Sequence, residues 1–128
     1  MGQKINIIQS KNAPKAIGPY SHAIKINGFI FCSGQIAIDP KTGNLIGKTT
    51  KIQTKQVLKN IKAVLKSAGS SVDKVVKTTV FLKNMKDFQE FNEVYELFFK
   101  PHKPARSTIE VSNLPKGALI EIEVIACM

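Results

Sequence analysis

The spacing of apolar residues changes twice along this chain, and these changes constrain its fold more than any other feature. Up to residue 39 the apolar residues form short runs bounded by Gly, Pro and Asn, which is typical of β-strands. Between Thr50 and Gly69 they recur at three- and four-residue intervals, and from Val75 to Leu82 they alternate again. A chain that mixes both periods in this way predicts an α+β fold.

Six strands and two helices follow from these patterns. Asn27-Gly28 best satisfies the positive φ angles of a two-residue type I′ turn, so it predicts a β-hairpin. Thr50 and Gln53 suggest a capping box at the start of the first helix, and Gly69 supplies its end. The expected strands cover residues 5–8, 22–26, 29–33, 75–82, 106–111 and 119–126, and the expected helices cover residues 50–68 and 87–99.

Each expected helix carries a single apolar stripe. Both helices should therefore cover one face of a mixed, mostly antiparallel sheet and leave the other face exposed in the monomer. In the last strand one face takes the aliphatic residues Ile120, Ile122, Val124 and Ala126.

The last two strands carry charged residues whose faces can be predicted from alternation. Ile109 and Val111 should point to the helix-covered face, and Arg106 and Thr108 to the opposite one. Glu121 should also lie on the uncovered face, where these polar residues could meet. A solvated face with ordinary cross-strand ion pairing is the alternative.

Length and cysteine content indicate one small domain that needs neither disulfide bonds nor a structural metal to fold. The 128 residues are 43% hydrophobic, which suits a single domain over residues 1–128. Cys32 and Cys127 have no metal-ligand or disulfide spacing, so we expect free thiols in a reducing compartment. The apolar runs are too short to span a membrane. These features favour a cytoplasmic location, with an organelle as the alternative.

The charge of the chain is strongly positive but spread out. The net charge is +10, yet the lysines occur at intervals without a dense cluster and the chain has no Trp. Lysines on solvated faces explain this pattern better than an RNA-binding surface, which stays open as the alternative. Of nineteen basic residues Arg106 is the single arginine. A guanidinium is a planar fork that grips a carboxylate through two parallel hydrogen bonds, so position 106 suggests carboxylate binding.

Five short motifs with consistent spacing give the chain a family resemblance over essentially its whole length. It resembles the reactive intermediate deaminase family, also called the YjgF or RidA family. The motifs are Ala16-Ile17-Gly18-Pro19-Tyr20-Ser21, Ser33-Gly34-Gln35, Phe91-Asn92-Glu93-Val94-Tyr95, Pro104-Ala105-Arg106-Ser107-Thr108 and, after Leu114-Pro115-Lys116-Gly117, Ile120-Glu121-Ile122-Glu123.

The resemblance implies a chorismate-mutase-like α+β fold that assembles as a homotrimer, with sites in the clefts between subunits. It implies hydrolysis of 2-aminoacrylate and similar enamine or imine acids to 2-oxo acids and ammonia, without a cofactor or metal. Arg106 would bind the substrate carboxylate and Glu121 would act as general base on the attacking water. The other substrate-binding residues that it implies are Tyr20, Ser33, Gly34, Asn92 and Thr108.

The chain departs from the family at one position, and the family has a second described activity. Some members have cysteine where this chain has Thr108, so a thiol-dependent role is excluded there. His22 and His102 are expected to be surface or hairpin residues without a catalytic role. Members have also been described as endoribonucleases and translation inhibitors, so RNA cleavage is the alternative function, and a non-catalytic ligand-binding trimer is a third.

Overall fold

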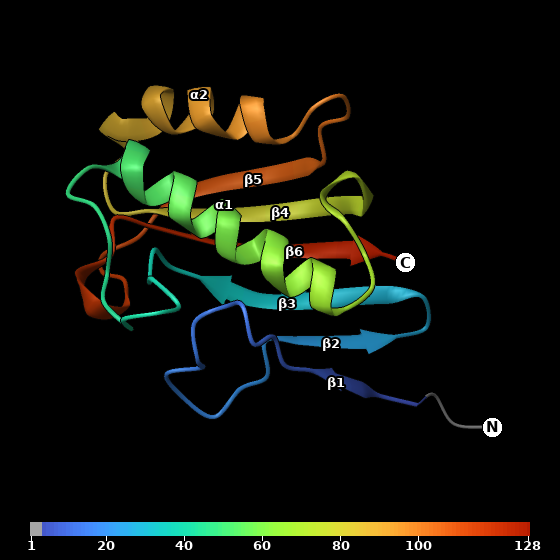
Figure 1. The fold of residues 1–128 in the computed structure, drawn as a ribbon. Coiled ribbons are helices and arrows are strands. Elements are labelled where there is room, and N and C mark those ends of the chain that lie inside the picture. Colours follow the sequence, from blue (N-terminus) through green and yellow to red (C-terminus); the bar gives the residue numbers. More distant parts are fainter. Residues whose placement is uncertain (1–3) are drawn as a thin grey trace.

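A six-stranded mixed sheet forms the centre of the molecule (Figure 1). The computed structural model describes residues 4–128. The strands lie in the order β1-β2-β3-β6-β4-β5. Only β4 and β5 pair in parallel, and the other neighbours are antiparallel. The strands are β1 (Asn6–Ile8), β2 (Ala23–Ile26), β3 (Phe29–Gln35), β4 (Val75–Leu82), β5 (Ala105–Glu110) and β6 (Ile120–Cys127).

Two α-helices lie on the same side of this sheet (Figure 1). Helix α1 (Thr50–Ser67) crosses the central strands, and α2 (Phe88–Phe98) lies beside it over the β5 edge. The predicted α+β fold, with a mostly antiparallel mixed sheet and two helices on one face, is confirmed. Short 3₁₀ helices occur at η1 (Val72–Lys74), η2 (Met85–Asp87) and η3 (Pro115–Gly117).

The predicted hairpin joins β2 and β3. Asn27 has a φ of 51° and Gly28 a φ of 80°, the left-handed values that a type I′ turn needs at both central positions. Ile26 and Phe29 are paired directly on either side of the turn. The Asn-Gly prediction is therefore confirmed.

The hydrophobic core lies between the helices and the sheet. From β6 it takes the four aliphatic residues predicted for the covered face, all of them buried. From the helices it takes Leu58, Ile61 and Leu65 of α1 and Phe91 of α2, which are also fully buried. Since β6 is central in the sheet and contacts α1, its alternation is enforced by burial on one side, and the sequence pattern was informative there.

Helix α1 starts one residue earlier than the predicted capping box requires. Its N-cap is Thr49, whose side chain accepts a hydrogen bond from Ile52 N at 3.2 Å. Thr50 is buried and donates its hydroxyl to Asp87 at 2.6 Å. Gln53 instead accepts a hydrogen bond from Leu119 N at 2.8 Å. The Thr50–Gln53 capping box is therefore wrong, because tertiary contacts occupy both side chains.

The predicted facing of β5 is also wrong. The parallel register places Arg106 beside Thr78 and Thr108 beside Val80, and both β4 residues are fully buried on the helix side. Arg106 and Thr108 therefore face the helices. Ile109 lies on the uncovered face and is 46% exposed. β5 is an edge strand, so its side chains are less constrained by burial and apolar alternation gave the opposite result.

Val111 belonged to the same prediction, and the structure places it just beyond the end of β5. Its backbone N–H donates to Leu82 O at 2.9 Å, so the backbone pairing with β4 continues one residue past the strand.

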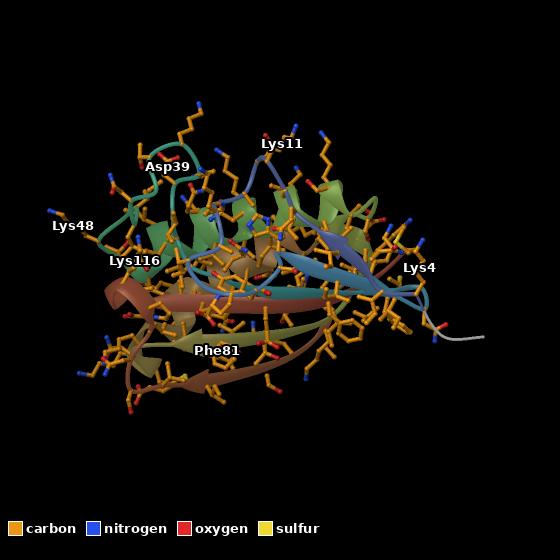
Figure 2. The ribbon with its side chains drawn as sticks, turned by 90° about the horizontal axis from the view of Figure 1, so that it is seen from below. Lys4, Lys11, Asp39, Lys48, Phe81 and Lys116 are labelled. Carbon is orange, nitrogen blue, oxygen red and sulfur yellow. The ribbon has the colours of Figure 1, made fainter. Side chains whose placement is uncertain are left out.

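The sheet face away from the helices is rich in exposed apolar residues. Phe81 projects from β4 on this side, opposite α1 (Figure 2). The register places Phe31, Ile125 and Ile109 on the same face. Phe31 is 45% and Ile109 46% exposed, and an apolar group of this kind, interrupted here by Glu121 and Glu123 of β6, is typical of an interaction site in soluble proteins.

The lysines are dispersed around the molecule, as the sequence indicated. The labelled Lys4, Lys11, Lys48 and Lys116 project outward from separate parts of the chain (Figure 2). Across residues 4–128 no helix has the length and apolar character that crossing a bilayer requires.

The N-cap of α1 can be tested by substitution. Thr49→Ala removes the side-chain acceptor for Ile52 N and should lower the free energy of unfolding by about 1 kcal/mol. Thr49→Ser keeps an acceptor and should lie close to wild type. Chemical denaturation at one fixed protein concentration measures both variants, and equal stability of Thr49→Ala and wild type would contradict the assignment.

Candidate functional site

Arg106 lies on β5 with its guanidinium against a group of aromatic rings from α2. Its Cζ is 5.5 Å from the ring centroid of Phe88, 5.1 Å from that of Phe91 and 4.8 Å from that of Tyr95. Its Nη1 donates to Asn92 Oδ1 at 2.9 Å. These contacts fix the plane of the guanidinium, since each ring attracts the cation through its π face.

Most of the donors of Arg106 remain available. A guanidinium has five N–H donors, and Asn92 takes one of them. Among residues 4–128 no carboxylate forms an ion pair with Arg106. A half-buried cation without a paired carboxylate can bind an anionic ligand.

A pocket of about 540 Å³ opens beside this guanidinium, a size that suits a small molecule. The lining residues are Asn92, Tyr95, Glu96, Lys103, Pro104 and Arg106.

Tyr95 connects the arginine to the core. Its hydroxyl and Thr78 Oγ1 lie 2.7 Å apart, in hydrogen-bond contact. Burial raises the pKa of Tyr95, while the Thr78 hydrogen bond and the charge of Arg106 act in the opposite direction. Tyr95 is therefore neutral at physiological pH and supports Arg106 through its ring.

Glu121 lies on the other face of the sheet. It is paired with Phe81 across β6 and β4, and its side chain packs against Gly34 of β3. A Cβ at position 34 would lie 2.6 Å from Glu121 Oε2, so a glycine is required for this approach. Burial raises the pKa of Glu121, and the like charge of Glu123 raises it further.

Ser33 and Tyr20 lie on the segments next to Gly34. Ser33 Oγ donates to Ser21 O at 2.6 Å, which ties β3 to the segment after Tyr20. The Tyr20 hydroxyl accepts from Ile17 N at 3.2 Å, and the side chain is 41% exposed. The β3–β6 register shifts between Cys32 and Gln35, an irregularity that includes Ser33 and Gly34.

The predicted site residues thus fall into two groups within one chain. Arg106, Asn92 and Thr108 lie on the helix side at the β5 edge. Glu121 and Gly34 lie on the uncovered face, Glu121 on β6 two strand spacings or about 10 Å inward, and Gly34 on β3 one strand further. The prediction that Arg106, Thr108 and Glu121 meet on the uncovered face of one chain is wrong, because β5 has the opposite facing.

Two features of the arginine group were not identified as site features from the sequence. Phe88, Phe91 and Tyr95 lie on the apolar stripe of the helix expected over residues 87–99, and their spacing alone does not distinguish a core role from contact with Arg106. Thr108 Oγ1 is buried and, among the described residues, has no hydrogen-bond partner. The unpaired hydroxyl can be found only from the structure.

The two histidines have structural roles. His22 is 4% exposed, so it is not a surface residue, but its carbonyl accepts from Ser33 N at 3.0 Å and extends the β2–β3 pairing, which agrees with its prediction as a hairpin residue. Its Nδ1 accepts from Ser10 N at 2.8 Å, and its Nε2 lies 2.7 Å from Pro14 O. This pairing satisfies both ring nitrogens inside the fold. His102 Nε2 lies 2.9 Å from Val75 O.

The described residues give little support to a metal-binding site or to a reactive thiol. No cluster of three or more His, Cys, Asp or Glu side chains within residues 4–128 could hold a metal ion. Cys32 and Cys127 are free, as predicted. Burial raises the pKa of Cys32 to about 12, so this thiol is protonated at neutral pH.

Comparisons with known proteins agree with this architecture. The sequence model described as endoribonuclease L-PSP matches residues 10–128. A RutC family protein of Pyrococcus horikoshii is 58% identical over 120 residues, which cover 94% of this chain and 95% of the relative. The human protein named 2-iminobutanoate/2-iminopropanoate deaminase is 46% identical over 120 residues, 94% of this chain and 88% of the relative.

A solved structure also matches closely. The Rid family protein YyfA from Yersinia pestis superimposes with a TM-score of 0.95 at 55% identity, covering 98% of this chain and all of the other (100%).

The environment of Glu121 predicts a gain in stability when its charge is removed. The raised pKa means that the folded state disfavours the charged Glu121 carboxylate. The charge therefore lowers the free energy of unfolding at pH values above the pKa of Glu121 in the folded state. This loss of stability disappears below its pKa in the unfolded state, about 4.3. Glu121→Gln, which keeps the side-chain shape, should therefore raise the free energy of unfolding at neutral pH. The difference in the free energy of unfolding between Glu121→Gln and wild type should vanish in acid, as measured by denaturation across pH.

The like charge of Glu123 can be tested separately. Glu123→Gln should lower the pKa of Glu121 in an NMR titration, and an unchanged pKa would contradict the like-charge contribution.

Proposed function

Because this chain belongs to the endoribonuclease L-PSP family, which includes reactive intermediate deaminases, we propose that it is a deaminase of small enamine or imine acids. The substrates would be 2-aminoacrylate and related acids, and the products 2-oxo acids and ammonia. The observation that carries this proposal is the guanidinium of Arg106, stacked on three rings, beside an open pocket and without a carboxylate partner among residues 4–128.

Arg106 would hold the substrate by its carboxylate. Asn92 takes one N–H and the ring stack fixes the guanidinium plane, so a pair of parallel donors can bind both carboxylate oxygens. Such charge-assisted hydrogen bonds contribute about 1.5 to 3 kcal/mol each. Since the carboxylate is attached to the reacting carbon, this contact also fixes the position of that carbon.

Glu121 would activate the water. A substrate that arrives as the enamine first takes up a proton at its methylene carbon and becomes the iminium. Glu121 then removes a proton from the water as the water oxygen bonds to the iminium carbon, and the C=N electron pair moves to nitrogen. The resulting tetrahedral adduct carries a hydroxyl and an amino group. Transfer of a proton to nitrogen lets the C–N bond break, and ammonia leaves as the C=O bond of the 2-oxo acid forms. The raised pKa of Glu121 brings its basicity closer to neutral pH, which favours a general base. An iminium carbon is already electrophilic, so no cofactor is required.

The other site residues would complete the pocket. Main-chain groups at Ser33 and Gly34 would contact the substrate next to Glu121, and Tyr20 would form a wall. The Thr108 main chain would contact it next to Arg106.

Two subunits would have to form each site. Arg106 and Glu121 lie on opposite faces of one sheet, too far apart to contact the same small acid within one chain. Packing of the apolar uncovered face around a threefold axis would bring the Glu121 side of one subunit to the open β5 edge of another. We therefore propose a homotrimer with sites at its subunit interfaces.

Substitution of Arg106 tests the carboxylate contact. Arg106→Ala should lower kcat/KM for enzymatically generated 2-aminoacrylate at least about 100-fold, and Arg106→Lys about 10-fold or more, because lysine loses the fork and the ring stacking. Pyruvate release in a coupled assay measures both. Lys62→Gln, an exposed lysine on α1, is the charge-matched control and should behave like wild type.

The opposite result would favour the RNA-directed alternative. If wild type fails to accelerate pyruvate release while RNA is cut equally well by Arg106→Ala, with a steep loss of activity in salt, the deaminase proposal fails.

Mixing two inactive variants tests the shared site. In trimers reassembled from equal amounts of Arg106→Ala and Glu121→Gln subunits, about one site in four receives both intact groups, because each half is intact with a probability of about one half. Pyruvate release should therefore recover to about a quarter of the wild-type rate. Each variant reassembled with itself is the control, and no recovery in the mixture would show that the two residues act within one chain.

A further inference from the structure

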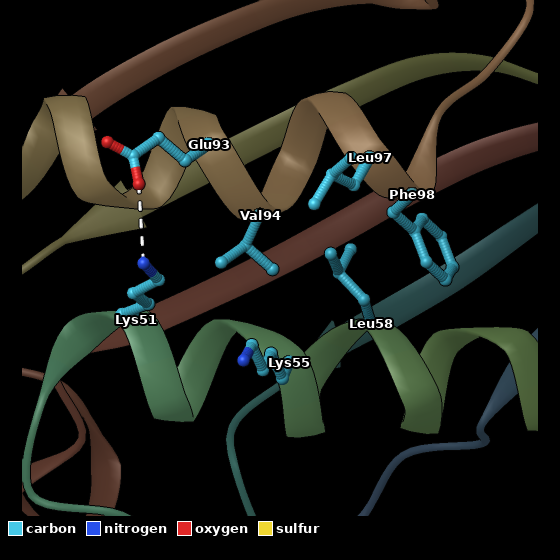
Figure 3. Close-up of a pocket in the computed structure, with 7 residues that line it drawn as sticks. All are labelled: Lys51, Lys55, Leu58, Glu93, Val94, Leu97 and Phe98. Atoms are coloured by element: carbon cyan, nitrogen blue, oxygen red, sulfur yellow. Dashed lines mark hydrogen bonds and ion pairs between the residues drawn. The ribbon is translucent and has the colours of Figure 1, made fainter.

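A groove between α1 and α2 has no role in the proposed reaction. It encloses about 470 Å³, which is within the range of small-molecule pockets. Side chains from both helices point into it (Figure 3). Its apolar lining consists of Leu58, Val94, Leu97 and Phe98. Leu97 is 70% exposed, although it lies directly beside a buried core.

The groove carries one uncompensated positive charge. Lys51 and Glu93 form an ion pair of 3.3 Å between the two helices at one end. Lys55 lies one turn further along α1 and lines the same groove. No acidic side chain in residues 4–128 pairs with Lys55. Two lysines and one glutamate leave a net charge of +1.

Charge and apolar surface are arranged in a fixed direction along the groove. Figure 3 shows the Lys51–Glu93 pair at one end and Phe98 at the other. The seven residue steps from Lys51 to Leu58 span about 10 Å of helix, and the three steps from Lys55 to Leu58 span about 5 Å. A ligand that matches this arrangement has one anionic end at Lys55 and an apolar chain that extends from there toward Phe98.

We propose that this groove binds a small aliphatic monocarboxylate. Its carboxylate would lie at Lys55, and its chain would contact Leu58, Leu97 and Phe98. A protein partner fits less well, because a stable interface needs about 800 Å² on each side, whereas the groove is short and carries a single unpaired charge. The groove lies on the helix side of the sheet, away from the uncovered face.

Calorimetric titration with butanoate, hexanoate, octanoate and decanoate tests the apolar part of the groove. Each methylene that enters the groove should lower Kd by up to about four-fold. The gain should stop when the chain exceeds the length of the groove. A Kd independent of chain length, or the absence of binding, would overturn the proposal.

Variants test the charge and locate the ligand. Lys55→Gln should weaken octanoate binding about two- to five-fold, to the level of neutral octanamide, and Lys62→Gln on the same helix should not. Leu97→Asn should weaken octanoate and octanamide alike. Amide NMR shifts with octanoate should map to α1 and α2 and persist in Arg106→Ala, which separates this groove from the proposed deaminase site.

Three other outcomes would refute the groove as a carboxylate site. The first is octanamide binding as tightly as octanoate to wild type. The second is loss of octanoate binding in Arg106→Ala. The third is a change of oligomeric mass in Leu97→Asn by analytical ultracentrifugation, which would make the groove an interface between copies of the chain.

Discussion

The contact between one guanidinium and three aromatic rings determines the geometry of the candidate site. The rings of Phe88, Phe91 and Tyr95 come from one helix and fix Arg106 from the side of the core. The Tyr95–Thr78 hydrogen bond connects this arrangement to the sheet. A lysine could keep the charge but not the planar stacking. The chain uses lysine at its other basic positions apart from the two histidines, and its single arginine is where the rings require a flat cation.

The opposite facing of Arg106 and Glu121 explains several features together. The apolar uncovered face, the open β5 edge and the half-buried carboxylate are each unfavourable in an isolated subunit. In the proposed trimer all three would become parts of interfaces or sites. Assembly and catalysis would then depend on the same surface, so a substitution that weakens subunit contacts would also lower activity.

Much of the fold could be predicted from the sequence, and the errors have physical reasons. Alternation was reliable in β6, where burial under α1 enforces it, and the Asn27-Gly28 turn was reliable because few residues tolerate positive φ. Alternation of apolar residues predicted the wrong facing for β5, because burial constrains the side chains of an edge strand less. The capping box failed because Thr50 and Gln53 make tertiary bonds. The family resemblance supplied the candidate residues, but their separation into two groups depends on strand facing, which residue identities do not reveal.

The contact between Gly34 and Glu121 has an evolutionary consequence. The space that a methyl group would need at position 34 is occupied by the carboxylate from β6, so a larger residue at position 34 requires the Glu121 side chain to move or to be shorter. An alanine at 34 would be compatible with a shorter acid such as aspartate at 121, but not with glutamate in its present conformation. Related sequences that replace the glycine at position 34 should therefore also differ from glutamate at position 121 more often than sequences that keep the glycine.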